Sequence, residues 1–144
     1  MDWFENADFW DAMAPYMFDD VRWERAADEI DGALELLEPA DDAHFLDLCC
    51  GPGRHSVELH QRGFAVTSVD RHQPYLDVLH EREPGIETVC RDMREFVREG
   101  AFDAALNLFT SFGYFEDPAD DLRVLRNVRE SLRPGGRFLM DTMS

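Results

Sequence analysis

The sequence predicts an α/β fold, a doubly wound parallel sheet of five strands with helices on both faces. Three observations support this prediction. Short apolar runs alternate along the chain with segments of helical periodicity, an order that is typical of parallel sheets. A Gly-Pro-Gly turn joins the first apolar run to the helix that follows it. The run 102–108 is almost continuously apolar, as is usual for a strand buried on both faces of a parallel sheet.

The helical segments are recognised by their spacing and by the residues that end them. Residues 18–37 repeat apolar side chains at helical spacing and stop before Pro39. Residues 54–61 form a short helix that ends at Gly63, and residues 73–83 form a helix that ends before a Pro-Gly pair.

Two further helical segments and the strands complete the order. Residues 93–99 are predicted as a helical turn with Phe96 and Val97 facing inward. Residues 118–132 are predicted as a helix whose buried stripe consists of Leu122, Leu125, Val128 and Leu132. The strands are expected at residues 45–49, 64–69, 86–90, 102–108 and 137–141, the last after a Pro-Gly-Gly turn.

The turn between the first strand and its helix carries the strongest functional signal. Asp47 stands near the end of the strand, Gly51 and Gly53 form the turn, and Asp70 closes the second strand nineteen residues after Gly51. This order of residues is typical of the start of a nucleotide-binding βαβ unit. Glycines let the backbone approach a bulky ligand, because a Cβ there would collide with it. Because an acid at the end of the second strand can accept hydrogen bonds from both ribose hydroxyls, the pattern predicts an adenosine-bearing cofactor.

Two residues near the turn distinguish between adenosine cofactors. The dinucleotide fingerprint places a third glycine where this chain has Ser56. Asp47 would repel a bound pyrophosphate, whereas it would favour an ammonium or sulfonium group. The pattern therefore favours S-adenosylmethionine, and it disfavours a dinucleotide oxidoreductase.

At these residues the chain resembles the class I S-adenosylmethionine-dependent methyltransferases of the small-molecule type. The segment 47–53, DLCCGPG, is similar to the first motif of that family, with Cys49 where the first glycine is usual. Asp70 matches the ribose-binding acid, and Asp92 with Met93 matches the position near the adenine. The segment after the fourth strand, NLFTSFGYF, and the turn into the fifth, LRPGGRFLMDT, match as well.

The resemblance covers roughly residues 20–144. It implies a Rossmann-like fold, S-adenosylmethionine as cofactor and methyl transfer to a small-molecule acceptor. Three of the acids it singles out have other possible functions: Asp70 could cap the helix that starts near His72, Asp92 could cap the turn at Met93, and Asp47 could be a buried acid bonded to the glycine turn. The cofactor-binding residues that the resemblance implies are Tyr16, Asp47, Cys49, Gly51, Gly53, Asp70, Arg71, Asp92, Met93 and Asn107.

The catalytic residues are left unassigned. Methyl transfer needs no general base, because the cofactor supplies the activation and the protein contributes positioning. His55 begins the helix beside the glycine turn, where a structural or cofactor-adjacent position is expected. Tyr114 follows the fourth strand, on the usual acceptor side of the related family, and is the better acid–base candidate. Asn107 is expected to touch the cofactor.

Residues 1–40 are expected to form an aromatic lid and a helix ahead of a cofactor-binding core, residues 41–144. In the related family such an N-terminal segment folds over the cofactor, where aromatic faces suit a sulfonium. Most of the aromatic side chains here are expected to pack the first helix onto the sheet instead. Tyr16 and Arg22 are the preferred lid residues, and Trp10 is a further candidate.

Members of this family usually add two strands after the fifth, and this sequence lacks them. The strand 137–141 would then be an edge, with apolar residues unpaired on one side. Three explanations stay open: a truncated gene or fragment, a dimer or partner chain that pairs with this edge, or a natural minimal domain. The alternative function is accordingly a non-catalytic fragment or subunit that binds the cofactor and needs a partner to complete the fold.

The charge balance narrows the class of partners. The 144 residues carry 31 acidic and 14 basic side chains, which gives a net charge of −17, and every base is Arg. Such a surface repels phosphates, which argues against nucleic-acid binding and favours a neutral or cationic acceptor. The abundance of Asp fits a halophile, in which salt screens the repulsion. A GC-rich genome explains the absence of Lys equally well.

Length, hydropathy and cysteine spacing indicate one cytoplasmic domain. The hydrophobic content of 44% suffices for a single core. Apolar runs are too short to cross a bilayer, and the acidic N-terminus lacks the basic start of a signal peptide. Cys49, Cys50 and Cys90 show neither a disulfide framework nor zinc spacing. We therefore expect no metal, no membrane contact and a cytoplasmic location.

Overall fold

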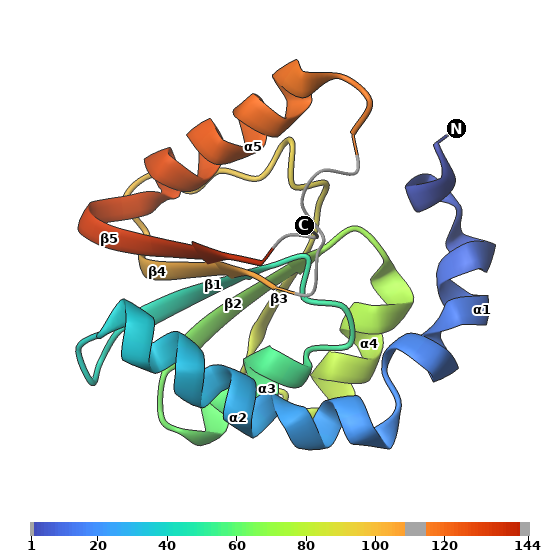
Figure 1. The fold of residues 1–144 in the computed structure, drawn as a ribbon, viewed down its shortest axis with the longest axis horizontal. Helices are drawn as coiled ribbons and strands as arrows, with labels where there is room; N and C mark the ends of the chain where they lie inside the picture. Colours follow the sequence, from blue (N-terminus) through green and yellow to red (C-terminus); the bar gives the residue numbers. More distant parts are fainter. Residues whose placement is uncertain (1, 109–114, 142–144) are drawn as a thin grey trace.

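The computed structural model describes residues 2–108 and 115–141, which form one five-stranded sheet with helices packed against it (Figure 1). All strand pairs are parallel, in the order β3-β2-β1-β4-β5. The predicted doubly wound parallel sheet of five strands is confirmed. The elements are η1 (Trp3–Glu5), α1 (Ala7–Met17), α2 (Asp20–Leu37), β1 (His44–Leu48), α3 (Arg54–Gln61), β2 (Ala65–Asp70), α4 (Gln73–Arg82), β3 (Glu87–Cys90), β4 (Phe102–Asn107), α5 (Pro118–Ser131) and β5 (Leu132–Met140).

One face of the sheet is covered by α2, α3 and α4 (Figure 1). The side chain of Asp19 accepts a hydrogen bond from the backbone N–H of Arg22 and so caps the start of α2. Ile30, Ala33 and Leu37 recur at helical spacing and are buried against the sheet. The predicted apolar face of this helix is therefore present.

The opposite face is covered by α5 and by the segment after β3 (Figure 1). Val124 and Val128, four residues apart, are buried against Phe102 and its neighbours in the sheet. Leu122 and Leu125 are exposed, so the predicted stripe was wrong at these two positions, whereas Val128 is buried and Leu132 packs against the same cluster. Leu122 precedes Val124 by two positions, which is about 200° around an α-helix. The buried stripe thus runs through Val124 and Val128, and the side of the helix that carries Leu122 faces solvent.

The segment after β3 forms an isolated turn, not the predicted helical turn over residues 93–99. The backbone N–H groups of Glu95 and Phe96 both donate to the carbonyl oxygen of Asp92, and the chain leaves the turn there. Phe96 is buried as predicted, but Val97 is exposed. Because the segment makes only one turn, only one of these two neighbouring side chains faces the core.

The last strand, β5, begins earlier than predicted. Phe102 pairs with Leu132 and Ala104 pairs with Arg137, so the intervening Pro-Gly-Gly is accommodated as an irregularity within the strand. Within the described residues β5 is one edge of the sheet, as expected. Three apolar side chains near its end are half-buried: Phe138, Leu139 and Met140.

The register of the parallel strands brings their carboxyl ends to one edge of the sheet. Asp47 pairs with Ser68 of β2 and with Leu106 of β4, and Asp70 pairs with Cys90 of β3. The strand order reverses at β1, since the chain passes from β3 across to β4. Ligands bind doubly wound sheets at this reversal, so the fold places Asp47 and Asp70 where a ligand is expected.

A pair of alanine substitutions separates backbone strain from side-chain collision at the start of α3. Gly53 and Gly63 both have left-handed backbone, with φ of 87° and 96°. A Cβ on Gly53 would collide with Leu79, whereas nothing lies within 4 Å of a Cβ on Gly63. We expect Gly63→Ala to lower the free energy of unfolding by roughly 1–2 kcal/mol, and Gly53→Ala by about 1–3 kcal/mol more. Urea denaturation measures both, and equal losses would contradict the collision.

A candidate cofactor site at the carboxyl edge of the sheet

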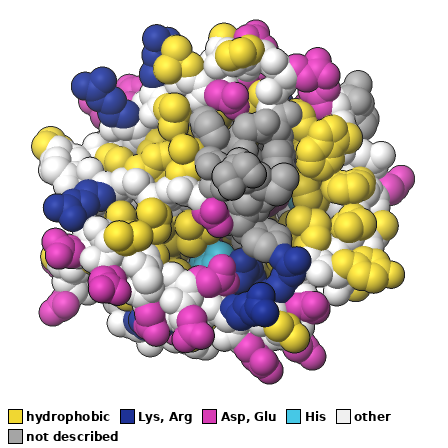
Figure 2. Space-filling view, in the orientation of Figure 1, with side chains coloured by type: hydrophobic (Ala, Val, Ile, Leu, Met, Phe, Trp, Pro, Cys, Tyr) yellow, Lys and Arg dark blue, Asp and Glu magenta, His cyan; other side chains and the backbone are white. Residues whose placement is uncertain are grey.

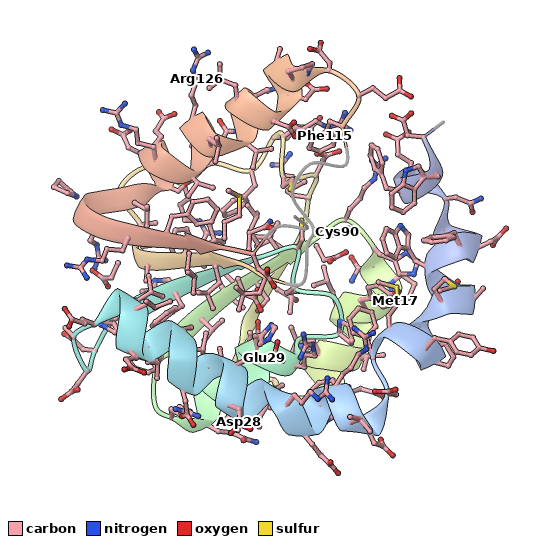
Figure 3. The ribbon with its side chains drawn as sticks, viewed as in Figure 1. Met17, Asp28, Glu29, Cys90, Phe115 and Arg126 are labelled. Carbon is pink, nitrogen blue, oxygen red and sulfur yellow. The ribbon has the colours of Figure 1, made fainter. Side chains whose placement is uncertain are left out.

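A cavity of about 190 Å³ lies between the carboxyl ends of the strands and the N-terminal segment. Its lining combines the turn after β1 and the starts of α3 and α4 with residues of η1 and α1. Met17 of α1 and Phe115 ahead of α5 approach it from different sides (Figure 3). On the face seen in Figure 2, apolar side chains gather over the N-terminal segment. The cavity therefore has one wall from the sheet edge and one from the first helices.

The turn after β1 has left-handed backbone at alternate residues. Cys49 and Gly51 both have φ of 60°, and Gly53 has φ of 87°. This conformation costs a residue with a Cβ roughly 1–2 kcal/mol, so Cys49 is strained where a glycine would not be. The Cys49 thiol donates to Met93 Sδ at 3.3 Å. At Gly51 a Cβ would stand 2.9 Å from the ring of Phe18, so this position needs glycine.

Asp70, at the end of β2, is bonded to backbone on both sides of the cavity. Its Oδ2 accepts the N–H of Gly51 at 2.9 Å, and its Oδ1 accepts the N–H of His72 at 2.8 Å. The N-cap of α4 is His72, so Asp70 bonds to the cap residue and is not itself the cap. Burial raises the pKa of Asp70 despite these bonds. Each carboxylate oxygen keeps a second lone pair, so Asp70 can still accept hydrogen bonds from a ligand in the cavity that it lines.

Asp92 belongs to a group of ion pairs that joins η1 to the core. Its Oδ2 lies 2.7 Å from Arg94 Nη2 and 3.2 Å from Arg71 Nη1. Glu5 of η1 binds the same two arginines, at 2.9 Å to Arg71 and 3.4 Å to Arg94. Burial opposes ionisation of Asp92, but the bonds from Arg94 outweigh it and hold its pKa below the usual value. Asp92 also accepts the backbone N–H of Arg94, so the expected cap of the turn is formed.

Asp47 lines the cavity as a buried acid. It is 2% exposed, and its Oδ2 accepts a hydrogen bond from Ser56 Oγ at 2.6 Å. Burial raises the pKa of Asp47 to about 6; the bond from Ser56 opposes this rise and the charge of Asp70 adds to it. A cation in the cavity would favour the ionised form. Ser56, which replaces the third glycine of the dinucleotide fingerprint, therefore supports an acid suited to a cationic ligand.

The N-terminal helix α1 lies against the cavity instead of packing on the sheet. None of its residues is buried, so the expectation that its aromatic side chains pack onto the sheet was wrong. Trp10 lines the cavity, and its carbonyl accepts the hydroxyl of Tyr75 at 2.8 Å. Asp11 and His72 are joined at 2.8 Å between Oδ1 and Nε2. These bonds tie α1 to α4, and the helix covers the cavity from its open side.

The two preferred lid residues do not line the cavity. Tyr16 is 72% exposed, because it lies on the solvent side of α1. Arg22 lies in the first turn of α2, where its carbonyl accepts a hydrogen bond from Arg54 at 3.0 Å. Met17 and Phe18 take the position expected for Tyr16. Of the three side chains expected in a lid, only Trp10 therefore lines the cavity.

Of the other predicted site residues, Cys49, Gly51, Arg71 and Met93 line the cavity, and two do not. Gly53 is the N-cap of α3 and lies against Leu79 of α4. Asn107 is fully buried, and its Nδ2 lies 4.0 Å from Met93 Sδ. Tyr114 falls outside the described residues.

Sequence reasoning missed several lining residues, among them Glu5 and Tyr75. Their partners are more than sixty positions away in the sequence, so no local pattern marks them. The density of aromatic residues near the N-terminus was the one usable signal. Within the described ranges, no group of three His, Cys, Asp or Glu side chains is arranged to hold a metal ion. Over the same residues, no helix combines the length and apolar character that crossing a membrane requires.

Comparison with known proteins places this site in a family. A family model described as a methyltransferase domain matches residues 45–136. The chain belongs to the class I S-adenosylmethionine-dependent methyltransferases. The matched range contains the glycine turn, Asp70 and Asp92. The family and the cofactor predicted from the sequence are therefore confirmed.

Three related methyltransferases illustrate the match. Cypemycin N-terminal methyltransferase from a Streptomyces species is 30% identical over 105 residues, which cover 72% of this chain and 43% of the relative. Human glycine N-methyltransferase is 31% identical over 128 residues, covering 75% and 43%. The solved structure of CalS10 with bound S-adenosylmethionine, an amino pentose methyltransferase from Micromonospora echinaspora, has a TM-score of 0.73 at 26% identity and covers 85% and 51%. The chain spans about half the length of these proteins.

Asp47→Asn is expected to stabilise the free methyltransferase domain at pH 8. The carboxyl titrates near 3.8 in an unfolded chain and at about 6 in the fold. Between these values the folded state binds more protons. The free energy of unfolding of the wild type therefore falls as the pH rises through this window, by about 3 kcal/mol. Asn cannot ionise but can accept the bond from Ser56. Urea unfolding should show the variant more stable at pH 8 and the two proteins alike below the window; a less stable variant at pH 8 contradicts the burial argument.

Proposed function

We propose that the chain is the cofactor-binding part of a methyltransferase that transfers the methyl group of S-adenosylmethionine to an amino group of a small molecule. The observation that carries the proposal is one cavity lined by the glycine turn, Asp70, Asp92 and the buried acid Asp47. Each of these four features suits a different part of a positively charged adenosyl ligand. The names of three relatives refer to an N-terminus, to the nitrogen of glycine and to an amino pentose, and two others are named as O-methyltransferases. The relatives with the higher identities thus favour an amine acceptor.

In this proposal each side of the cavity holds one part of the cofactor. Asp70 accepts hydrogen bonds from the ribose hydroxyls, and Asp92 lies at the adenine with Met93 and Cys49 as apolar contacts. The backbone at Gly51 allows close approach of the ligand. Arg71 orients Asp92 through their ion pair. Gly53 and Asn107 do not line the cavity: Gly53 shapes the turn, and Asn107 supports Met93.

The protein contributes position and exclusion of water to the reaction. S-adenosylmethionine supplies, when bound, a methyl group activated on a sulfonium. Asp47 would stabilise the positive end of the ligand, and the aromatic rings of Phe18 and Trp10 would close the cavity over it. Alignment of the acceptor nitrogen with the methyl group can then provide much of the rate enhancement. A general base on this chain is not required, and none is assigned.

In this proposal the chain has two functional parts. Residues 1–40 form the lid and its supporting helix, and residues 41–144 form the cofactor-binding core. The ion pairs of Glu5 with Arg71 and Arg94 support this division, because they fasten the first turn of the chain to the edge of the cavity. The acidic surface favours a neutral or cationic acceptor over a nucleic acid. Three free thiols favour a reducing compartment, which supports a cytoplasmic location.

A second candidate is a cofactor-binding subunit that is completed by another chain. The edge strand β5 favours it, because Phe138, Leu139 and Met140 are only half-buried there. A homodimer or a partner that adds strands would cover these residues. Light scattering during a titration with cofactor distinguishes the two candidates. Tight binding by a monomer supports the first, and binding that appears only in a larger species supports the second.

Calorimetric titration with S-adenosylmethionine tests the cofactor site, with NAD as the control ligand and concentrated salt to screen the surface charge. We expect micromolar binding of S-adenosylmethionine and none of NAD. Asp70→Asn should weaken binding at least about tenfold, because hydrogen bonds to a charged acceptor are lost. Asp77→Asn, on the exposed side of α4, should bind as the wild type does. Thermal melting confirms that each variant is folded. Equal binding of NAD, or an Asp70→Asn variant that binds normally, would contradict the proposed site.

Methyl transfer is tested with matched acceptors. Primary amines, among them glycine and an amino sugar, are compared with the corresponding hydroxy compounds in the presence of isotope-labelled cofactor. We expect label in the amines alone, with a rate that rises with pH as the neutral amine becomes available. Labelling of the hydroxy compounds with the amines unreactive would overturn the assignment of the acceptor class.

A further inference from the structure

Phe18 stands between two hollows of the molecule. It lies at the junction of α1 and α2 and lines the cofactor cavity on one side (Figure 1). On its other side is a groove of about 290 Å³ between α1, α2 and α4, called here the outer groove. Besides Phe18, the apolar lining of the outer groove includes Trp23, Pro52, Tyr75 and Val78. A shift of the Phe18 ring would therefore transfer space from the groove to the cavity.

The ring of Phe18 lies over the backbone of Gly51. A Cβ on Gly51 would stand 2.9 Å from Cζ and 3.1 Å from Cε1 of Phe18, closer than the about 3.5–4.0 Å at which carbon atoms pack. The ring thus fills the space beside the Gly51 Cα that a side chain would otherwise take. That is also the space that a glycine leaves for a closely approaching ligand. The ring and a ligand cannot occupy it together.

The volumes of the two hollows support a movement of this ring. The cofactor cavity, at about 190 Å³, is smaller than the about 300–1,000 Å³ that is usual for ligand pockets. Tyr75 also lies between the hollows, but it is 7% exposed and its hydroxyl is bonded to the carbonyl of Trp10. Phe18 is half-buried, and a phenyl ring has no such bond to break. Of these two rings, Phe18 is therefore the one that can shift at the lower cost.

We propose that the Phe18 ring and S-adenosylmethionine compete for the space at Gly51, and that the ring shifts into the outer groove when the cofactor binds. The inference rests on the proposed function, because that cofactor is the ligand. Only molecules whose ring has left Gly51 bind the cofactor, so the apparent affinity falls with the fraction in which the ring remains there. From the groove side the ring still covers the ligand. The room in the outer groove thus controls how tightly the cofactor binds on the other side of the ring.

Filling the outer groove tests the proposal, because Val78 lines the groove and not the cofactor cavity. Val78→Phe leaves the shifted ring too little room, so calorimetry should show the Kd of S-adenosylmethionine raised about tenfold. When Phe18 is first replaced by Ala, the same substitution at Val78 should leave Kd unchanged. Val97→Phe is the matched control, since the two valines are 46% and 44% exposed and Val97 lines neither hollow. It should bind as the wild type does.

NMR follows the position of the ring in the wild-type protein. Without cofactor, we expect a nuclear Overhauser effect between the ring protons of Phe18 and the Hα protons of Gly51. With saturating S-adenosylmethionine, this contact should disappear and one between the ring and a methyl group of Val78 should appear. This comparison needs no variant, so it decides the question even if thermal melting shows that Val78→Phe does not fold.

Three results would overturn the proposal. In the first, the contact between Phe18 and Gly51 persists with the cofactor bound. In the second, Val78→Phe binds S-adenosylmethionine as tightly as the wild type. In the third, Val78→Phe raises Kd equally with Phe and with Ala at position 18, which indicates an effect that does not pass through the ring. Failure of the wild type to bind S-adenosylmethionine at all would instead contradict the proposed function.

Discussion

The Asp70 carboxylate accepts two backbone N–H groups, from Gly51 and His72, and so joins the turn after β1 to the start of α4. The geometry of the cavity depends on this contact. It holds the left-handed turn in place and aligns the helix whose residues His72 and Tyr75 bind α1. Burial disfavours the charge on Asp70, yet two N–H donors stabilise it. A residue expected to bind the cofactor is therefore also the one that shapes the site.

The N-terminal segment is attached to this frame by charge and by aromatic contacts, and its Phe4 side chain is buried. Glu5 reaches Arg71 and Arg94, which also bind Asp92. Phe4 packs edge-on against Phe115, with ring centroids 5.3 Å apart. Ion pairs that stay partly open to solvent, as these do, are individually weak and are screened by salt. The cover of the cavity is thus held more loosely than the sheet beneath it, as access for a ligand requires.

The parts of the structure that could be predicted are those fixed by local sequence. The helix at residues 54–61 was predicted with its observed bounds, because Gly53 and Gly63 mark its ends. The glycine turn and Asp70 were predicted from spacing alone. The direction of side chains was harder to predict where apolar residues lie on more than one side of a helix: α5 buries Val124 and not Leu122, and only packing against the sheet decides between them. Tyr16 failed for the same reason, since nothing local says which side of α1 faces the cavity.

The strained cysteine in the turn has a chemical consequence for the proposed binding of an activated methyl group. Cys49 and Cys50 line the cavity, and a thiolate is a strong nucleophile toward such a group. Burial raises the pKa of both thiols well above the usual value, and the charges of Asp70 and Asp47 raise it further. Both side chains therefore stay protonated near neutral pH. The domain can keep two sulfur atoms beside an alkylating agent without becoming its own substrate.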